Sequence, residues 1–349
     1  MKVHLKHLTI VAAAFLSSTT LVSATGITYV CDPSIPSSVC DTLDTTIAGQ
    51  YSSTFGNANA SIYVAFNSSA GLGESAQYYN FTSYTEYRNA LIADSSGDAI
   101  DLAALASLPA TEPSLYGGSD VEVTSALAQA LGLGTGEGTT SSLGPCSSPG
   151  SSGCYDGVIY LATISNLTSD GYGYYYGTGI QAANEFNIYS VVEHETDEIL
   201  GTASCIDTTS GSLVDGCGGS SPSAVDLFRY QDPGVRVLES TTPGAYFSYD
   251  GGVTNGAGTT TYNTLANGND YADFTQNCQQ VQDADGCAGS TQYITNDGGA
   301  EINILDAVGY NLNDENPPAV PEPPTLSLFA TGLCSVAALV RRRYRKPAA

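Results

Sequence analysis

The stretch VVEHETDEILG, from Val191 to Gly201, contains the only histidine that follows the amino-terminal leader. Residues four apart lie on one face of a helix, so His194 and Glu198 can reach the same metal ion. Glu195 follows His194, as in the HExxH motif, where this glutamate activates a metal-bound water. Glu198 replaces the second histidine of that motif. The stretch therefore predicts a helix on which His194 and Glu198 bind a metal and Glu195 acts as general base.

An acidic helix with one histidine could also be a solvated surface face in so acidic a chain. The apolar residues of this helix argue against that alternative, because a fully solvated helix does not need them. They are Tyr189, Val191, Val192, Ile199 and Leu200. The apolar spacing predicts a helix from Ala182 to Leu200, ended by Gly201.

The third ligand of this site is less evident from the sequence. A catalytic zinc site usually has three protein ligands and a water. Long metzincin motifs supply the third ligand three residues after the glycine, where this chain has Ser204, a poor ligand. We expect Asp226, in AVDLFRY, to be the third ligand, with Asp207 as the second choice. The alternative for Asp226 is a structural salt bridge with Arg229 or Arg236.

Tyr230, in the same segment, is a candidate hydrogen-bond donor to the transition state. A shell of one histidine and two carboxylates is more anionic than a histidine-rich shell, which weakens the Lewis acidity of zinc. Slower peptide hydrolysis or a different divalent ion is therefore a hypothesis. Zn²⁺ is the expected cofactor. Ca²⁺ is the alternative, because acidic residues occur in glycine-rich stretches such as GNDYADF (268–274), although this stretch also fits a turn.

The beginning of the chain predicts export. Residues 1–24 combine Lys2 and Lys6, an apolar run and the small residues Ser23 and Ala24. This order is typical of a secretory signal peptide with its cleavage site. A membrane anchor is the alternative, and the short apolar core argues against it.

The last residues, 320–349, form a second targeting segment. They begin with Pro-Glu-Pro, continue with an apolar run from Thr325 to Val340 and end in a basic cluster. The apolar run is short for a spanning helix, which needs about 20 residues. The order of these parts resembles the PEP-CTERM sorting tail of Gram-negative bacteria. The resemblance implies removal by a dedicated inner-membrane sorting protease after a transient association with that membrane. An ordinary tail anchor is the alternative.

The charge of the remaining body, residues 25–319, limits its partners. All but one of the 35 acidic residues lie there, with only three of the ten basic residues, Arg88, Arg229 and Arg236. So negative a field repels nucleic acids and anionic surfaces. It suits an exported protein that stays soluble or binds cations.

The cysteines of the body fall into four pairs that are close in the sequence. In an exported chain this pattern predicts four local disulfides. The pairs are Cys31 with Cys40, Cys146 with Cys154, Cys205 with Cys217, and Cys278 with Cys287. Cys334 lies in the sorting tail.

Further elements follow from periodicity. β-Rich segments predict strands at 60–66 and 157–162, and apolar spacing predicts helices at 84–93, 121–131 and 300–308. The Gly, Ser and Thr residues of 132–153 predict a surface loop or linker. We expect one mixed α+β domain over 25–319, because strands on both sides are needed to sandwich the central helix.

Several blocks of the body are similar to a family of exported bacterial metalloproteases that also end in PEP-CTERM tails. They are GLGESAQYYNFTSYTEYRNAL, IDLAALASLPATEP, HETDEILG, AVDLFRYQDPGVRVL, AYFSYDGG, GNDYADF and INILDAVGYNL, which cover most of the body from about Ala60 to Leu312. The resemblance implies a zincin-like domain with a mixed sheet, a central active-site helix and an HExxE motif. Such proteases keep an edge strand for the substrate, and the strand before the helix lies at a fitting distance. Thr202 stands where the family commonly has arginine.

These observations predict a secreted metallopeptidase that hydrolyses peptide bonds with a metal-activated water. Its partners would be a peptide or protein substrate and the sorting protease, and its location the cell surface or the extracellular space. The first alternative is a non-catalytic surface or biofilm-matrix protein with a structural metal or none. The second is a metal-dependent hydrolase that acts on glycan-linked substrates.

Overall fold

The computed structural model describes residues 26–111, 120–206, 217, 221–239, 242–265, 270–275 and 277–313. The predicted signal peptide at 1–24 and the predicted sorting tail at 320–349 lie outside these residues, and so does Asp207. In the part of the chain that is described, no helix is long and apolar enough to span a membrane.

Among the described residues, the amino-terminal half contains five strands and five α-helices, with one π-helical segment between the first two helices. In order they are β1 (Ile27–Cys31), α1 (Ser37–Thr42), η1 (Leu43–Ile47), α2 (Ala48–Thr54), β2 (Ala60–Asn67), β3 (Gly73–Gln77), β4 (Tyr79–Ser83), α3 (Tyr84–Asp94), α4 (Ala99–Ser107), β5 (Asp120–Thr124) and α5 (Ser125–Ala130).

The second half carries the predicted metal-binding helix between short strands and loops. Its elements are β6 (Gly138–Thr139), β7 (Pro145–Cys146), β8 (Gly157–Ala162), α6 (Ile164–Ser169), β9 (Gly173–Tyr175), β10 (Glu185–Asn187), α7 (Ile188–Asp197), η3 (Glu198–Thr202), η4 (Val225–Phe228), β11 (Arg229–Asp232), β12 (Val235–Arg236), β13 (Tyr246–Phe247) and α8 (Ala300–Val308).

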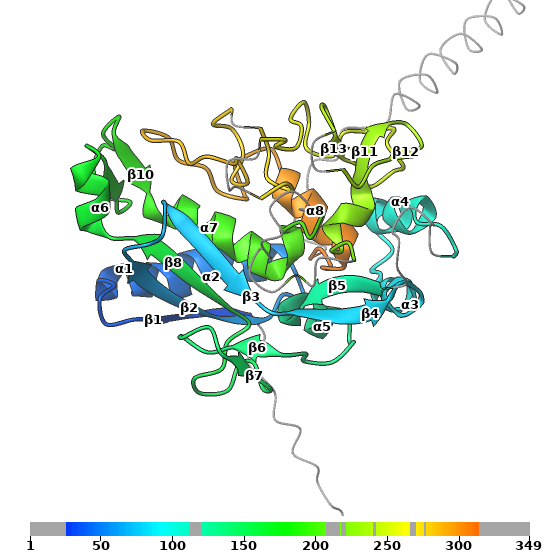
Figure 1. Ribbon diagram of the computed structural model, residues 1–349, viewed down its shortest axis with the longest axis horizontal. Coiled ribbons are helices and arrows are strands. Elements are labelled where there is room, and N and C mark those ends of the chain that lie inside the picture. Colours follow the sequence, from blue (N-terminus) through cyan, green and yellow to red (C-terminus); the bar gives the residue numbers. More distant parts are fainter. Residues whose placement is uncertain are drawn as a thin grey trace, which may run out of the picture.

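The largest sheet has four strands in the order β1-β2-β8-β3. β1, β2 and β8 are parallel, whereas β3 pairs antiparallel with β8 and lies at the edge. Helix α7 lies along this sheet, and the loops that follow β13 cover the other side of the helix (Figure 1). This arrangement confirms the predicted α+β class with a mixed sheet.

The edge strand is not the one that the sequence indicated. The predicted strand at 157–162 forms as β8, but it lies inside the sheet between β2 and β3. Its burial pattern explains this position, because five of its six residues are buried, as expected for a strand with neighbours on both edges. The edge is β3, which the sequence analysis did not identify as a strand.

Two predicted helices are shorter than expected. The segment 121–131 begins as β5, which pairs antiparallel with β4, and only then continues as α5. Val121, Val123 and Thr124 are β-branched, which favours a strand. The Thr124 hydroxyl accepts a hydrogen bond from Leu127 N–H and starts the helix at Ser125.

The central helix begins at Ile188 rather than at Ala182. Residues 185–187 form β10, which pairs with β9, and Asn187 caps the helix by accepting a hydrogen bond from Tyr189 N–H. At the other end, Gly201 has φ 129°, so the chain leaves the helix there. The helices predicted at 84–93 and 300–308 form as α3 and α8.

One apolar core holds these elements together. It extends from Ile27 in β1 to Tyr310 after α8 and includes the buried face of α7. All four predicted disulfides are confirmed, with S–S distances of 2.00 to 2.03 Å. Each joins two cysteines that are close in the sequence, and the Cys31–Cys40 disulfide ties the end of β1 to helix α1.

Candidate metal centre

Helix α7 and the turn η3 are buried around most of their circumference. Acidic side chains share this burial: Glu193 and Asp197 are 0% exposed, Glu195 is 5% and Glu198 is 9%. A solvated acidic face is therefore the wrong interpretation of this stretch. Ionised carboxylates are costly to bury unless a cation, a proton or hydrogen-bond donors compensate them.

His194 has a fixed ring orientation. Its Nδ1 lies 3.0 Å from the carbonyl oxygen of Val281. A carbonyl can only accept a hydrogen bond, so the ring proton belongs on Nδ1 and the lone pair on Nε2. Metal-binding histidines commonly use this arrangement, in which a backbone carbonyl holds one nitrogen and the other faces the ion.

Two carboxylates lie beside Nε2, the other ring nitrogen of His194. Glu198 Oε1 is 3.7 Å from Nε2, as expected for residues four apart on a helix. Asp273 Oδ1 is 3.6 Å from the same nitrogen. Asp273 comes from the GNDYADF stretch, whose acids the sequence analysis assigned to a turn or a calcium loop. The structure thus brings a further acid to the predicted pair of His194 and Glu198, from a segment that follows the helix by more than 70 positions.

Glu195 belongs to the same group of side chains. One ligand atom each from His194, Glu195 and Glu198 lie within 4.8 Å of one another. Asp273 is outside this closest set, although it contacts His194. Burial raises the pKa of Glu195 well above its usual value, and the charges of Glu198 and Asp273 raise it further. Burial and the Glu198 charge act in the same way on the pKa of Asp273.

The amide of Gln282 connects the histidine with the aspartate in this structure. Its Nε2 donates a hydrogen bond of 3.0 Å to Asp273 Oδ1 and lies 3.3 Å from His194 Nε2. The same amide is bonded only weakly on its other side, where Thr202 Oγ1 lies 3.4 Å from its oxygen. A metal ion would compete with this amide for both atoms.

The edge strand β3 touches the two glutamates of the motif. Ser75 Oγ donates a hydrogen bond of 2.6 Å to Glu198 Oε2, which leaves Oε1 directed at His194. Gly73 approaches Glu195 so closely that a Cβ there would collide with its carboxylate and with Val191. A larger residue at this position would therefore displace the carboxylate of the general-base candidate.

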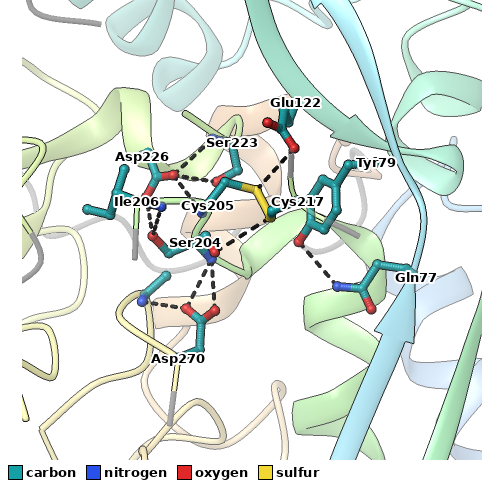
Figure 2. Close-up of a disulfide and its surroundings, with 11 residues drawn as sticks. Gln77, Tyr79, Glu122, Ser204, Cys205, Ile206, Cys217, Ser223, Asp226 and Asp270 are labelled. Carbon is teal, nitrogen blue, oxygen red and sulfur yellow. Dashed lines mark hydrogen bonds between the residues drawn. A yellow bond between two sulfur atoms is a disulfide. The ribbon is translucent and has the colours of Figure 1, made fainter. Parts of the chain in front are cut away.

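Asp226, the predicted third ligand, does not join this group. Figure 2 shows its carboxylate among neutral donors: Ser204 Oγ at 2.6 Å, Cys205 N at 2.9 Å, and the backbone N–H and hydroxyl of Ser223, each at 2.9 Å. These bonds satisfy both oxygens. Asp226 therefore anchors the loop after α7, and it forms neither of the two salt bridges considered as its alternative role.

Ser204 separates Asp226 from the carboxylates near His194. Its hydroxyl bonds to Asp226, whereas its backbone N–H donates to both oxygens of Asp270, three positions before Asp273 (Figure 2). The second choice of ligand, Asp207, lies outside the described residues.

Tyr230, the candidate hydrogen-bond donor, lies in a different environment. The guanidinium of Arg236 lies 4.9 Å above its ring. Arg236 in turn donates to the carbonyl oxygen of Ser107, at the end of α4. No described contact joins Tyr230 to His194 or its carboxylates. The arginine contact gives the tyrosine a packing role instead.

A second group of metal-type residues, Glu122, Cys205 and Cys217, lies near the loop after α7. The two sulfur atoms are 2.01 Å apart in a disulfide, and Glu122 Oε2 is 3.8 Å from Cys205 Sγ (Figure 2). Thiolates, not disulfides, bind metals. While the disulfide is intact, this group is not a metal centre.

Comparison with protein-family models, curated proteins and solved structures finds no match for this chain.

Proposed function

We propose that this protein is a secreted metal-dependent peptidase of zincin-like type in which His194, Glu198 and Asp273 hold a divalent cation. The observation that carries the proposal is the surroundings of His194 Nε2. This nitrogen is freed by the bond from Nδ1 to the Val281 carbonyl and has a carboxylate oxygen within 3.7 Å on each of two residues.

The donor set fits a divalent cation. No arginine or lysine nitrogen of the described residues lies within 4.0 Å of Glu195, Glu198 or Asp273. Three buried carboxylates and one imidazole therefore share a site without an arginine or lysine partner among the described residues. One imidazole nitrogen with carboxylate oxygens is a ligand set that zinc accepts, and other first-row divalent ions accept it too.

A divalent cation bound there would polarise the peptide carbonyl and lower the pKa of a bound water. Glu195 would take a proton from the attacking water on its carboxylate and return it to the amine as the C–N bond breaks. Its contact with Glu198 and the close approach of Gly73 keep the carboxylate in place. Water adds across the peptide bond, so the products are a carboxylate and an amine.

Strand β3 supports a peptide as the substrate. It is the last strand of its sheet among the described residues, so one of its edges has no paired strand. An extended peptide can add to such an edge through main-chain hydrogen bonds. Gly73 and Ser75 are two positions apart in β3 and therefore lie on the same face of the strand, where they touch Glu195 and Glu198. A peptide bound along this strand would therefore pass close to the metal ligands.

The test combines metal analysis with peptide hydrolysis on the purified protein. We expect about one equivalent of zinc in the wild type and in Glu195→Gln, and none in His194→Ala. Hydrolysis of a mixed peptide library should occur with the wild type and with neither of these two variants. Glu137→Gln, which makes the same change at an exposed position, is the matched control and should behave as the wild type. A wild type that takes up no metal, or a Glu195→Gln variant of full activity, would overturn the proposal.

The non-catalytic alternative has one observation in its favour. The Gln282 amide already satisfies Asp273 Oδ1 and lies against His194 Nε2, so the three side chains form a connected arrangement without an ion. A protein that folds stably, binds no metal and loses little stability in His194→Ala would favour this alternative, with a surface or matrix role.

A further inference from the structure

Helix α4 packs against α8 (Figure 1), and a second cluster of acids is formed by residues of these two helices. Asp98 is the N-cap of α4, Asp101 lies in the first turn of that helix, and Asp306 lies near the end of α8. One carboxylate oxygen from each lies within 4.8 Å of the others. Two oxygens that bind one Ca²⁺ at 2.3–2.6 Å are separated by about that distance or less.

Asp306 is the side chain that distinguishes this cluster from an ordinary acidic surface. It is 0% exposed, and no N–H or hydroxyl group of the described residues donates to either of its carboxylate oxygens, whose polar neighbours are the carboxyl groups of Asp98 and Asp101. Buried carboxylates in proteins are normally hydrogen-bonded, paired with a cation or bound to a metal. No ion pair joins Asp306 to any described arginine. An ionised Asp306 would therefore have no cationic partner among the described residues.

The other two carboxylates are held in place by the loop before α4. Asp98 Oδ1 accepts hydrogen bonds from the N–H groups of Ile100 and Asp101. Asp101 Oδ2 accepts from the backbone and hydroxyl of Ser96 at 2.7 and 2.9 Å. Asp98 Oδ2 also accepts a hydrogen bond of 3.0 Å from the Ser96 hydroxyl, so both oxygens of Asp98 and one oxygen of Asp101 are engaged by the protein. No hydrogen bond from the chain reaches Asp101 Oδ1.

We propose that Asp98, Asp101 and Asp306 bind a calcium ion that joins the amino-terminal end of α4 to α8. The donors are all oxygens, with no histidine or thiolate among them, which selects a hard cation over zinc. Backbone carbonyls and waters would complete the coordination shell. The ion compensates the Asp306 charge and fixes α8, which packs against the turn η3 that carries Glu198.

The test uses His194→Ala as the background, so that the first site does not contribute. After treatment with a chelator, Ca²⁺ is added and both its binding stoichiometry and the thermal unfolding midpoint are measured. We expect about one equivalent of Ca²⁺ and a midpoint that rises by roughly 5 °C or more at saturating calcium. Adding Asp306→Asn to this background should abolish both the calcium binding and the rise in midpoint. Without calcium, the double variant should be no less stable than His194→Ala alone.

Two controls keep the result interpretable. Asp170→Asn makes the same change at an exposed position and should leave the calcium response intact. Asp98→Ser keeps an N-cap acceptor but removes the ligand charge, so it should weaken calcium binding even if Asp306→Asn fails to fold. An equal calcium response with and without Asp306 would overturn the proposal. The proposal would also be overturned if the unfolding midpoint of the His194→Ala protein depended on pH but not on calcium. A proton shared between the aspartates would then take the place of the ion.

Discussion

The Nδ1 atom of His194 lies 3.0 Å from the carbonyl oxygen of Val281, 87 positions further along the chain. The neighbours of Val281 hold this carbonyl in place. Gln282 N–H donates a hydrogen bond of 2.9 Å to Glu301 Oε1 on α8, and the Cys278–Cys287 disulfide closes the loop around it. The direction of Nε2 is therefore set by a segment that the helical motif does not contain.

Substitutions at Asp273 and Asp226 should show which of the two is the third metal ligand. The structure indicates Asp273, whereas the sequence indicated Asp226. We expect Asp273→Asn to lower zinc affinity by more than the roughly 10- to 100-fold that loss of an outer-shell partner costs. Asp226→Asn should leave zinc affinity within about threefold. It should instead lower the free energy of unfolding by about 1–3 kcal/mol, because it weakens bonds to buried donors.

Competitive zinc titration and chemical denaturation of both variants provide the measurement. If Asp226→Asn lost zinc while Asp273→Asn retained it, the assignment from the sequence would be right and the one from the structure wrong.

The hydroxyl of Ser75 should contribute to metal affinity without binding the metal. It donates a hydrogen bond of 2.6 Å to Glu198 Oε2 and so orients Oε1 towards His194. We expect Ser75→Ala to weaken zinc binding by about 10- to 100-fold. Ser53→Ala, at an exposed site in α2, serves as the control in the same titration. Equal affinities for the two variants would show that Glu198 does not depend on this bond.

Tyr51 should stabilise the buried side of the central helix. Its hydroxyl donates a hydrogen bond of 2.6 Å to Asp197 Oδ1, and the other oxygen of Asp197 has no donor. Tyr51→Phe leaves this buried carboxylate without any hydrogen bond, and we expect a loss of about 1–3 kcal/mol in the free energy of unfolding.

Tyr63→Phe is the matched control for that substitution. Its hydroxyl makes a similar bond of 2.7 Å to Asp32 Oδ2, but at a partly exposed site where water can replace it. Urea denaturation should therefore show a smaller loss for Tyr63→Phe. Equal losses would mean that the burial of Asp197 does not increase the cost.

The stability of the protein should depend on pH through Asp283. Burial raises the pKa of this carboxyl group from 3.8 to about 6. Between these values the folded form keeps a proton that the unfolded form has lost. The contribution of Asp283 to stability is therefore complete below pH 4 and is lost as the pH rises through 6.

In Asp283→Asn this proton is no longer exchanged. As the pH rises from 4 to 7, the unfolding midpoint of the variant should therefore increase relative to that of the wild type. A series of thermal melts across this range is the check, and parallel curves for the two proteins would contradict the assignment.

Several features of the fold follow from short stretches of sequence. The four disulfides join cysteines only 8 to 12 positions apart, so their pairing needed no knowledge of the fold. Helix α8 has its predicted bounds because its apolar periodicity ends at Gly309, a residue with φ 130°. The proximity of His194 and Glu198 is likewise local, since the helical repeat places residues four apart on one face.

The remaining features depend on contacts between distant segments. Asp226 and Asp273 are both acids that follow loops rich in small residues, and no local pattern separates them. The packing of the loop after β13 against α7 brings Asp273 to His194, while Ser204 and Ser223 hold Asp226 aside. The edge position of β3 and the meeting of Asp98 with Asp306 were also undetermined by local sequence. Backbone and side-chain periodicity fix what lies within one helical turn or one short loop. Which distant segments come together is decided by the burial of the shared apolar core. The free energy of this burial depends on contacts among residues from the whole chain and not on any one segment.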